Sequence, residues 1–452
     1  MADTIVAIAT APGEGGISIV RLSGPEAEAV LHRVFLPASA AAWPLESHRL
    51  TYGTAREGET PLDECMAVLM RAPRSYTRED VAELQLHGGG STAGRVLQAC
   101  LRAGARLAEP GEFTRRAFCN GRIDLSQAEA VMALIRSRGE QARQAALRQL
   151  TGGAAAFVRK AADELYGIQA GLAACIDYPE EVSEEEAASS LSPRILVLAE
   201  TLEEAADEQG ARIAREGLRV ALCGRPNVGK SSLLNALTRQ ELAIVTPVAG
   251  TTRDTVQGEL TLGGCLIRVT DTAGMRETED PVERLGVERA LKALREADTV
   301  LLVFDASLPL TEEDRALAAQ VRSLGKPDVL AVRNKSDLPE ATRETDLAAL
   351  LPGVPCLTVC AQEPESLRPL REALRQRAQA GDTLALTQPR HLEAARRAAG
   401  HLRQAARTLA EAPCDLAAVD LLAAQQALAE ITGDAVEEKL LDRVFADFCV
   451  GK

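Results

Sequence analysis

The chain has 452 residues, of which 46% are hydrophobic and 26% charged, and this length is typical of about three soluble globular domains. We find no apolar run that could cross a bilayer, and the first residues carry neither a basic region nor a cleavage pattern, so we expect a cytoplasmic protein without a membrane partner. The net charge of −14 disfavours nucleic-acid binding by the molecule as a whole, so any RNA contact would need local basic patches or a partner protein.

The cysteines are scattered along the chain. There are 10 of them, without a paired spacing or a nearby histidine pattern. This distribution indicates reduced thiols and argues against a disulfide framework or a zinc site.

Residues 1–119 are expected to form an α+β domain. Short apolar or alternating runs predict strands at Ile5–Ala9, Gly16–Leu22, Cys65–Met70 and Val81–Leu86. Helices are expected at Pro25–Val34 and Ser91–Ala103. The sequence HGGGS at 87–91 indicates a turn before a helix, with an anion site as the alternative.

Residues 120–215 and 379–452 are rich in Ala, Leu, Gln, Glu and Arg and predict an all-α helical domain in two parts. Leu125, Ala128, Met132 and Ile135 share one helical face, which is typical of a bundle core. Residues 176–193 contain prolines and an acidic run, so we expect them to form an exposed connection between long helices. Basic residues are either solvated or face RNA: Arg115, Arg116, Arg122, Arg136, Arg138, Arg143 and Arg148.

Residues 216–378, between the two helical parts, show an alternation of strands and helices. Strands are expected at Leu218–Cys223, Gln257–Leu262, Cys265–Thr270, Thr299–Phe304, Val329–Arg333 and Cys356–Val359. This rhythm indicates a doubly wound α/β domain, whose neighbouring ends allow insertion into a helical domain. The two helical parts would then pack as one bundle.

The first of these strands leads into GRPNVGKSS at 224–232. Gly224 and Gly229 allow a tight turn whose N–H groups surround phosphate oxygens, and Lys230 adds a positive charge. Ser231 offers a hydroxyl to Mg²⁺. The stretch therefore predicts a nucleotide-binding P-loop.

Two further motifs indicate which nucleotide is bound. DTAG at 271–274 follows a strand, where a carboxylate can hold Mg²⁺ and a backbone N–H can sense the γ-phosphate. In NKSD at 334–337, Asp337 can accept hydrogen bonds from guanine, Asn334 can serve N7, and Lys335 can cover the base. In this order the motifs favour GTP over ATP and resemble the translation-factor-related P-loop GTPases.

The residue after DTAG is Met275, which cannot orient water as the glutamine of Ras-like proteins does. One interpretation is a slow or inactive switch. The other is that Asn227 and the carbonyls of 246–254 form an oxygen cage for a monovalent cation, with selection of K⁺ over Na⁺ set by the cage. Glu283 would then act on the nucleophile through a bridging water.

With PGEFTRRAF at 110–118, GTTRD at 250–254, ERLGVER at 283–289 and the terminal CVGK, the whole chain resembles the tRNA modification GTPase family MnmE, also called TrmE. The resemblance implies a K⁺-activated GTPase that forms a homodimer through its N-terminal domain. It further implies action on tRNA with the FAD-dependent protein MnmG, in a heterotetramer, at C5 of the wobble uridine. The added group is aminomethyl or carboxymethylaminomethyl, built with a one-carbon tetrahydrofolate derivative.

The resemblance also implies site residues. K⁺ would be bound by Asn227, Thr246, Val248 and Thr251, and Mg²⁺ by Ser231 and Thr252, while Glu283 would assist hydrolysis. The N-terminal domain would have a tetrahydrofolate-binding-like fold, with folate residues Arg21, Glu83, Arg122 and Lys452. The expected GTP-binding residues are Asn227, Val228, Gly229, Lys230, Ser231, Ser232, Thr246, Pro247, Val248, Ala249, Gly250, Thr251, Thr252, Asp271, Thr272, Ala273, Gly274, Asn334, Lys335, Asp337, Cys360, Ala361 and Gln362.

Two features near the chain's functional motifs leave alternatives open. Cys360, Ala361 and Gln362 replace the family's usual SAK or SAR, so a hydroxyl and a cation that support GTP affinity are lost. Cys449 follows a helix expected to run to about Phe448, whose negative end disfavours a thiolate, so the residues alone indicate an ordinary exposed thiol. The resemblance instead implies a redox or catalytic role for this thiol.

The rival function is a regulatory GTPase switch of the ribosome-assembly type that binds rRNA. Such a protein is expected to carry an RNA-binding module, for example a KH domain with GXXG and basic flanks. We find no such module after the G domain in the sequence.

Overall fold

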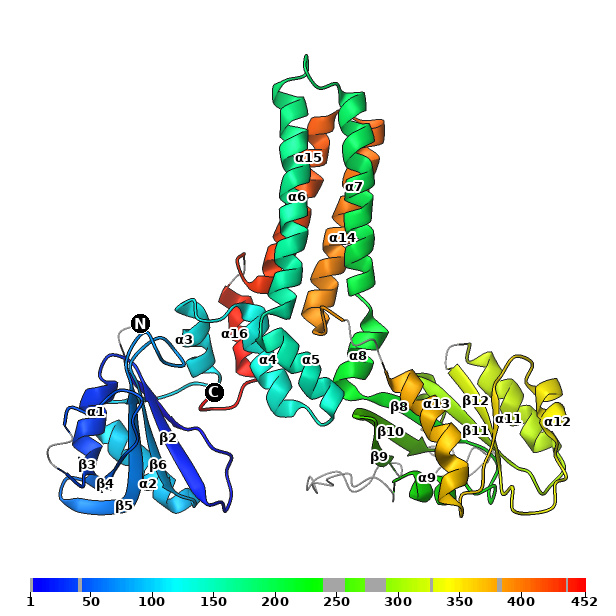
Figure 1. Ribbon diagram of the computed structural model, residues 1–452, viewed down its shortest axis with the longest axis horizontal. Coiled ribbons are helices and arrows are strands. Elements are labelled where there is room, and N and C mark those ends of the chain that lie inside the picture. The colour runs from blue at the N-terminus through cyan, green and yellow to red at the C-terminus, as the bar shows by residue number, and fades with distance from the viewer. Residues whose placement is uncertain are drawn as a thin grey trace, which may run out of the picture. The chain divides into compact units, whose positions relative to one another are not determined.

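The computed structural model describes residues 3–39, 43–238, 257–272, 290–325, 328–379, 384–435 and 438–452 (Figure 1). These residues form two compact units. The first unit comprises Met1–Met132, Gln149–Ala199 and Arg397–Lys452, and the second comprises Ala133–Arg148 and Glu200–Arg396. Each unit has its own hydrophobic core, so each is described separately.

The first unit contains a sheet of seven strands with order β3-β4-β5-β6-β2-β1-β7. Neighbouring strands are antiparallel except β1 and β7, which are parallel. The strands are β1 (Ile5–Ile8), β2 (Ile17–Ser23), β3 (Phe35–Pro37), β4 (Thr51–Glu57), β5 (Thr60–Met70), β6 (Val81–His87) and β7 (Arg106–Leu107).

Helices α1 (Ala27–Val34) and α2 (Gly90–Arg102) pack on one face of this sheet. Side chains alternate between the faces of a strand, and β1 is buried on both. Val6 joins the core beneath α1 and α2, whereas Ile5 and Ala7 pack on the other face with Phe113. Phe113 belongs to α3 (Glu112–Cys119), so α3 covers part of the second face.

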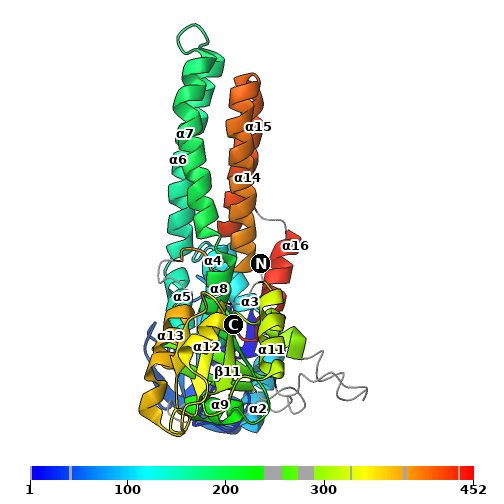
Figure 2. The ribbon, with the colours of Figure 1, turned by 90° about the vertical axis from the view of Figure 1, so that its right-hand side faces the viewer.

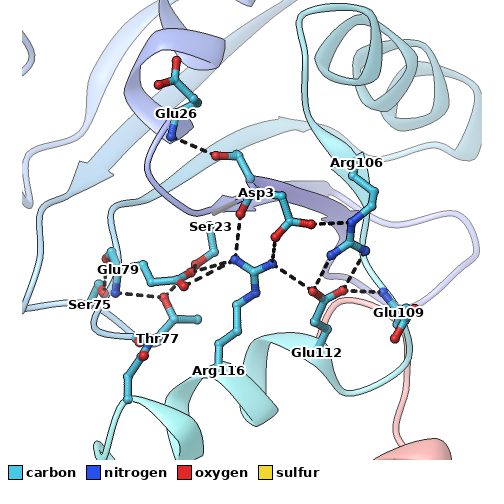
Figure 3. Close-up of polar contacts among 12 residues, drawn as sticks. Asp3, Ser23, Glu26, Ser75, Thr77, Glu79, Arg106, Glu109, Glu112 and Arg116 are labelled. Atoms are coloured by element: carbon cyan, nitrogen blue, oxygen red, sulfur yellow. Dashed lines mark hydrogen bonds and ion pairs between the residues drawn. The ribbon is translucent and has the colours of Figure 1, made fainter. Parts of the chain in front are cut away.

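Arg116 of α3 holds this second face together (Figure 3). Its side chain is only 1% exposed and contacts three carboxylates, with Nη2 2.9 Å from Asp3 Oδ1, Nη2 2.9 Å from Glu112 Oε1 and Nη1 3.2 Å from Glu79 Oε2. Arg106 donates to both Asp3 and Glu112. The buried guanidinium therefore joins α3 to the segment before β1 and to the loop before β6.

Long helices form the rest of the first unit, where α6, α7, α14 and α15 run side by side (Figures 1 and 2). Gln169 of α6 donates to Gln425 of α15, and Arg397 of α14 pairs with Glu430 of α15. The helical segments before and after residues 216–378 therefore pack together. The helices are α4 (Leu125–Arg136), α6 (Gly153–Asp177), α7 (Glu184–Ala205), α14 (Pro389–Glu411), α15 (Cys414–Thr432) and α16 (Glu438–Ala446).

The second unit contains a six-stranded sheet with order β13-β12-β11-β8-β10-β9. Only β9 is antiparallel to its neighbour. The strands are β8 (Leu218–Cys223), β9 (Gln257–Leu262), β10 (Cys265–Asp271), β11 (Thr299–Asp305), β12 (Asp328–Asn334) and β13 (Cys356–Thr358). The helices are α5 (Glu140–Leu150), α8 (Glu208–Glu216), α9 (Lys230–Thr238), α11 (Glu312–Ser323), α12 (Glu344–Leu350) and α13 (Arg368–Ala378), with the 3₁₀ turn η2 (Pro364–Leu367).

Separate apolar clusters cover the two faces of this sheet, as in a doubly wound fold. Leu222 of β8 lies in one cluster and Cys223 in the other, so the strand that leads into the P-loop is buried on both faces. The carboxyl ends of β8, β10, β11 and β12 meet at one edge, where ligands bind in such sheets. The expected fold class, an α+β domain, helical segments and an α/β P-loop domain between them, is confirmed.

Three expectations about local structure are wrong. The segment 176–193 is mostly helical, because α6 continues to Asp177 and α7 begins at Glu184. The acidic residues Glu184, Glu185 and Glu186 form the first turn of α7, where negative charge is favoured by the helix dipole. The C-terminal helix ends at Ala446, two residues before the expected end. Arg116 is buried, so it cannot face RNA.

Candidate functional site

The P-loop lies between the central strand β8 and helix α9. Gly224 has φ +155°, and a Cβ there would lie 2.4 Å from the carbonyl oxygen of Val303. Gly229 has φ +98°, and a Cβ there would lie 2.2 Å from Asn334 Nδ2. Both positions therefore require glycine, for the backbone conformation and for the close approach of neighbouring strands. Val228 is buried between them, and Ser232 is exposed on the first turn of α9.

Lys230 is 7% exposed, and its Nζ donates to the carbonyl oxygens of Gly224 at 2.8 Å and Arg225 at 2.9 Å. Burial lowers the pKa of the Lys230 ammonium, while nearby Asp271 opposes the shift. The loop thus holds a desolvated cation against its own carbonyls. An anion that entered the loop would satisfy this charge better than the carbonyl dipoles do.

Ser231 and Asp271 meet beside the P-loop, with Ser231 Oγ donating to Asp271 Oδ2 at 3.1 Å. The other carboxylate oxygen, Asp271 Oδ1, is buried and has no hydrogen-bond partner among the described residues. The neighbouring Thr272 hydroxyl is buried and donates to the carbonyl of Leu222 at 2.7 Å, which fixes the end of β10. A hydroxyl and an unpaired carboxylate oxygen fit a Mg²⁺ ion, which prefers oxygen ligands.

Asn334 joins the base-recognition loop to the P-loop. It is 1% exposed at the end of β12, and its Nδ2 donates to the carbonyl oxygen of Val228 at 2.9 Å. Its Oδ1 accepts from the backbone N–H of Ala361 at 3.1 Å. One amide side chain therefore fixes three loops, a role that the motif alone did not indicate.

Lys335 follows with φ +64°, and its Nζ lies 2.6 Å from Asp305 Oδ2. Burial opposes ionisation of Asp305, but hydrogen bonds from Lys335 and Ser307 outweigh it and hold its pKa below the ordinary value. The ion pair holds the stem of Lys335 across the end of β11. The structure thus orients the side chain expected to cover the base.

Cys360 and Asp337 lie in contact, although the sequence suggested only the loss of a serine hydroxyl at Cys360. The buried Cys360 thiol donates to Asp337 Oδ1 at 3.2 Å. Burial and the hydrogen bond to Asp337 raise the pKa of this thiol, so it stays protonated and can donate at neutral pH. The thiol therefore takes the place of a hydroxyl donor. The N–H of Ala361 is donated to Asn334 rather than left free for guanine O6, and Gln362 is exposed nearby.

Asn227 is exposed with φ +65° at the tip of the P-loop. A left-handed backbone is uncommon outside glycine, although asparagine tolerates it best. The other expected ligands of the cation cage and the switch residues lie outside the described residues: Thr246, Pro247, Val248, Ala249, Gly250, Thr251, Thr252, Ala273, Gly274, Met275 and Glu283.

Arg21 and Glu83 form a second constellation on the sheet of the first unit. They lie directly opposite each other on the antiparallel strands β2 and β6, with Arg21 Nε 2.7 Å from Glu83 Oε1. The guanidinium carbon of Arg21 is 5.6 Å from the centre of the Tyr76 ring, and that of Arg122 is 4.8 Å from the same centre. Three of the four expected folate residues therefore meet around one aromatic ring.

The C-terminal tail reaches the same place. Arg21 Nη1 is 3.5 Å from the carbonyl oxygen of Gly451, and Val450 pairs with Pro110 in an isolated bridge. A Cβ at Gly451 would lie 2.5 Å from the carbonyl oxygen of Ile8, so the tail is closely packed. Lys452 is half-buried and Cys449 is exposed at this tail.

Among the described residues, no cluster of His, Cys, Asp and Glu could hold a metal ion by itself. The same part of the chain contains no helix with the length and apolar character needed to cross a bilayer. The metal site beside the P-loop would thus depend on phosphate and water as well as on protein oxygens.

Comparison with known proteins identifies the family of this chain. The family described as GTP-binding protein TrmE N-terminus matches residues 4–122, and the MnmE helical domain matches residues 125–449. Proteins named tRNA modification GTPase MnmE are 47% identical over 460 residues in Symbiobacterium thermophilum and 45% identical over 473 residues in Heliobacterium modesticaldum, with 100% of this chain and 99% of each relative covered. The relative from Bacillus subtilis is 42% identical over 474 residues, with 100% of both chains covered. The chain belongs to the MnmE (TrmE) family of GTPases.

Proposed function

We propose that this chain hydrolyses GTP and that the hydrolysis serves tRNA modification. The observation that carries the GTPase proposal is the pair of hydrogen bonds made by Asn334, which holds the base-recognition loop against the P-loop. Because of this link, we expect one nucleotide to contact both the P-loop and Asp337. The names of the relatives support the role in tRNA modification.

Base specificity can be tested by Asp337→Asn. Guanine offers N1–H and an amine to a carboxylate, whereas xanthine has a carbonyl in place of that amine, which an asparagine amide can bind. We expect the variant to hydrolyse xanthosine triphosphate better than GTP, with Asp177→Asn, an exposed residue at the end of α6, as the matched control. An unchanged preference for GTP in the Asp337 variant would remove Asp337 from the site.

Mg²⁺ belongs to this proposal, held by Ser231 and, as expected from the resemblance, Thr252. The ion would neutralise charge on the β- and γ-phosphates. The unpaired Asp271 Oδ1 supports the assignment. Chelation of Mg²⁺ should abolish turnover.

K⁺ is proposed as the activating cation, bound by Asn227, Thr246, Val248 and Thr251, while Glu283 assists the attacking water. The exposure of Asn227 at the tip of the P-loop supports this role, because its side chain is accessible to an ion beside the phosphates. Turnover should be faster in KCl than in NaCl, and Asn227→Ala should remove the difference. Equal rates of the unaltered protein in both salts would count against the cation.

We further propose that the first unit binds a one-carbon tetrahydrofolate derivative at Arg21, Glu83, Arg122 and Lys452. The charge pair Arg21–Glu83 offers a donor and an acceptor on one side of Tyr76, which suits a planar heterocycle with several polar edges. This chain and MnmG together would transfer the carbon unit to C5 of the wobble uridine in tRNA. Nucleoside mass spectrometry of tRNA from a strain carrying Glu83→Gln, with Glu46→Gln as control, tests this step.

The remaining assignments follow the family resemblance. We propose a cytoplasmic homodimer that binds MnmG in a heterotetramer, with domains at 1–119, 120–215, 216–378 and 379–452. Cys449 is proposed as a redox or catalytic thiol, supported by its exposure on the tail that reaches Arg21. Cys449→Ser should then abolish modification without changing GTP turnover.

The alternative is a ribosome-assembly switch that binds rRNA. It would predict GTP-dependent cosedimentation with ribosomal subunits and unchanged wobble-uridine chemistry in a deletion strain. For this chain we expect no GTP-dependent cosedimentation with ribosomal subunits and a loss of the wobble-uridine modification in the deletion strain.

A further inference from the structure

A hollow of about 510 Å³ lies in the first unit between the segment before β4 and the loop that joins β5 to β6. We call it the arginine hollow, because Arg74, Arg78 and Arg122 line it together with His48 and Tyr76. None of the residues that line it is acidic. Arg74 and Arg122 belong to no ion pair among the described residues, and Arg78 donates to a backbone carbonyl, that of Asn120, at 3.0 Å.

Arginines without a carboxylate beside them are unexpected in a chain with a net charge of −14, in which acidic residues outnumber basic ones. The hollow of about 390 Å³ in the second unit also contains arginines, but Glu365 and Glu372 line it as well. Nearby, exposed Arg49 pairs with Glu46 at 2.8 Å. Three guanidinium groups around one hollow without a carboxylate therefore indicate a site for an anionic ligand.

The backbone supports the same conclusion. Among the described residues, four that are not glycine have positive φ: His48, Arg78, Asn227 and Lys335. Asn227 and Lys335 belong to the nucleotide site, whereas His48 and Arg78, with φ +65° and +61°, line the arginine hollow. Left-handed backbone costs free energy for such residues and is concentrated at binding sites.

Tyr76 connects this hollow to the Arg21–Glu83 pair, since its ring contacts Arg21 as well as Arg122. The Tyr76 hydroxyl hydrogen bonds to Thr114 at 2.9 Å, and Arg116 fixes Glu79 at the end of the same loop (Figure 3). The wall of the hollow is thereby anchored to α3. A ligand seated on Arg21 and Glu83 can extend past Tyr76 into the hollow.

We propose that the arginine hollow binds the γ-linked glutamate tail of the tetrahydrofolate, an inference that rests on the folate part of the proposed function. Each γ-linked glutamate adds a carboxylate, so an oligoglutamate matches several guanidinium groups at once. RNA is the weaker candidate, because Tyr76 joins the hollow directly to the Arg21–Glu83 pair, so the tail of a ligand that is bound to that pair reaches the three arginines first.

The test compares 5-formyltetrahydrofolate carrying one glutamate with the same compound carrying three, by calorimetry on the full chain at low salt. We expect the triglutamate to bind about tenfold more tightly, since each exposed charge pair contributes modestly. Arg74→Gln, alone and with Arg78→Gln, should remove this advantage and leave the affinity for the monoglutamate unchanged. Arg49→Gln removes an exposed arginine outside the hollow, so this control variant should still bind the triglutamate more tightly than the monoglutamate.

The outcomes separate this inference from the proposed function. If the monoglutamate binds and the longer tail adds nothing, the arginine hollow is not a tail site, while the folate site stands. If neither compound binds, both are wrong. If the Arg74 variant weakens tRNA binding and keeps the preference for the triglutamate, the hollow contacts RNA and the proposal is overturned.

Discussion

Asn334 Nδ2 donates to the carbonyl oxygen of Val228 at 2.9 Å, a bond between residues 106 positions apart. Because Asn334 is 1% exposed, its removal would take the hydrogen-bond partner from the buried carbonyl of Val228 and from the partly buried N–H of Ala361. We expect Asn334→Ala to lose about 1–3 kcal/mol of stability. GTP affinity should fall as well, because three loops lose their common anchor.

Denaturant unfolding and nucleotide titration measure the two effects of Asn334→Ala. Asn235→Ala is the control, since Asn235 is exposed on α9. Equal nucleotide affinities of both variants would contradict the role of Asn334 as an anchor.

Gly229→Ala should abolish nucleotide binding. The new Cβ would lie 2.2 Å from Asn334 Nδ2, and the backbone at φ +98° disfavours any side chain. Gly400→Ala is the matched control, because this exposed glycine lies inside α14 and a Cβ added there would meet no atom within 4 Å. We expect the control to bind GTP normally and to gain up to about 1 kcal/mol of stability. Fluorescent GDP binding separates the two.

Cys360 variants test whether a thiol can replace the hydroxyl of related GTPases. Cys360→Ser should retain GTP affinity, since a hydroxyl can donate to Asp337 as the thiol does at 3.2 Å. Cys360→Ala should weaken GTP binding by about threefold to tenfold, the usual net contribution of a single hydrogen bond. If the serine and alanine variants bind GTP equally, the contact with Asp337 does not support nucleotide binding.

Arg116→Met should destabilise the first unit. Three carboxylates would lose their common partner, and breaking a buried ion pair costs about 3–5 kcal/mol. The chain has a single tryptophan, Trp43, which lies in the first unit and contacts His32, so its fluorescence reports this unit alone. Arg49→Gln removes an exposed pair and should change stability by less than about 0.5 kcal/mol. A loss of similar size in both variants would refute the structural role of the buried network.

Acid should weaken the same network. Arg106 lowers the pKa of Asp3 through a hydrogen bond. Burial opposes ionisation of Glu112, but hydrogen bonds from Arg106, the Glu109 N–H and Arg116 outweigh it, so its pKa is also lowered. A carboxyl group with a lowered pKa in the folded state stabilises the protein above its unfolded pKa, here 3.8 for Asp3 and 4.5 for Glu112.

The first unit should therefore lose stability as the pH falls below about 4.5. The loss should continue until the pH has passed the lowered pKa values that Asp3 and Glu112 have in the folded protein. Urea unfolding followed by Trp43 fluorescence at pH 6.5, 4.5 and 3.5 measures this dependence. Asp3→Asn removes one titrating group and should give a shallower pH profile. A profile as steep as that of the unaltered protein would exclude Asp3 as a contributor.

Local patterns were readable from the sequence because their physics is local. The P-loop needs only a strand, two glycines, a lysine and a helix in order, and residues 218–238 supply them within one segment. The strands of the second unit were likewise evident from short apolar runs. By contrast, β3, β4 and β7 were not predicted, because they lie within mixed or polar stretches whose pairing depends on neighbouring strands.

The charged residues were harder to interpret. Arg115 and Arg116 are adjacent in the sequence but lie in different surroundings. Arg115 is partly exposed, and its Nη2 lies 3.1 Å from Asp442 Oδ1, whereas Arg116 is buried among carboxylates. The sequence predicts that both are charged and helical. Which of them enters the protein depends on how α3 is rotated against the sheet, and this rotation is set by Phe113 and its partners.

The sequence by itself determined the α/β P-loop domain, its place between helical segments and the preference for guanine, because each depends on residue order within short motifs. Only the tertiary structure decided that Asn334 anchors the P-loop, that Cys360 supports Asp337, and that Arg21, Arg122 and Arg74 lie around Tyr76. These contacts join residues far apart in the chain, and their distances depend on strand register and helix packing. Spacing in the sequence does not specify either.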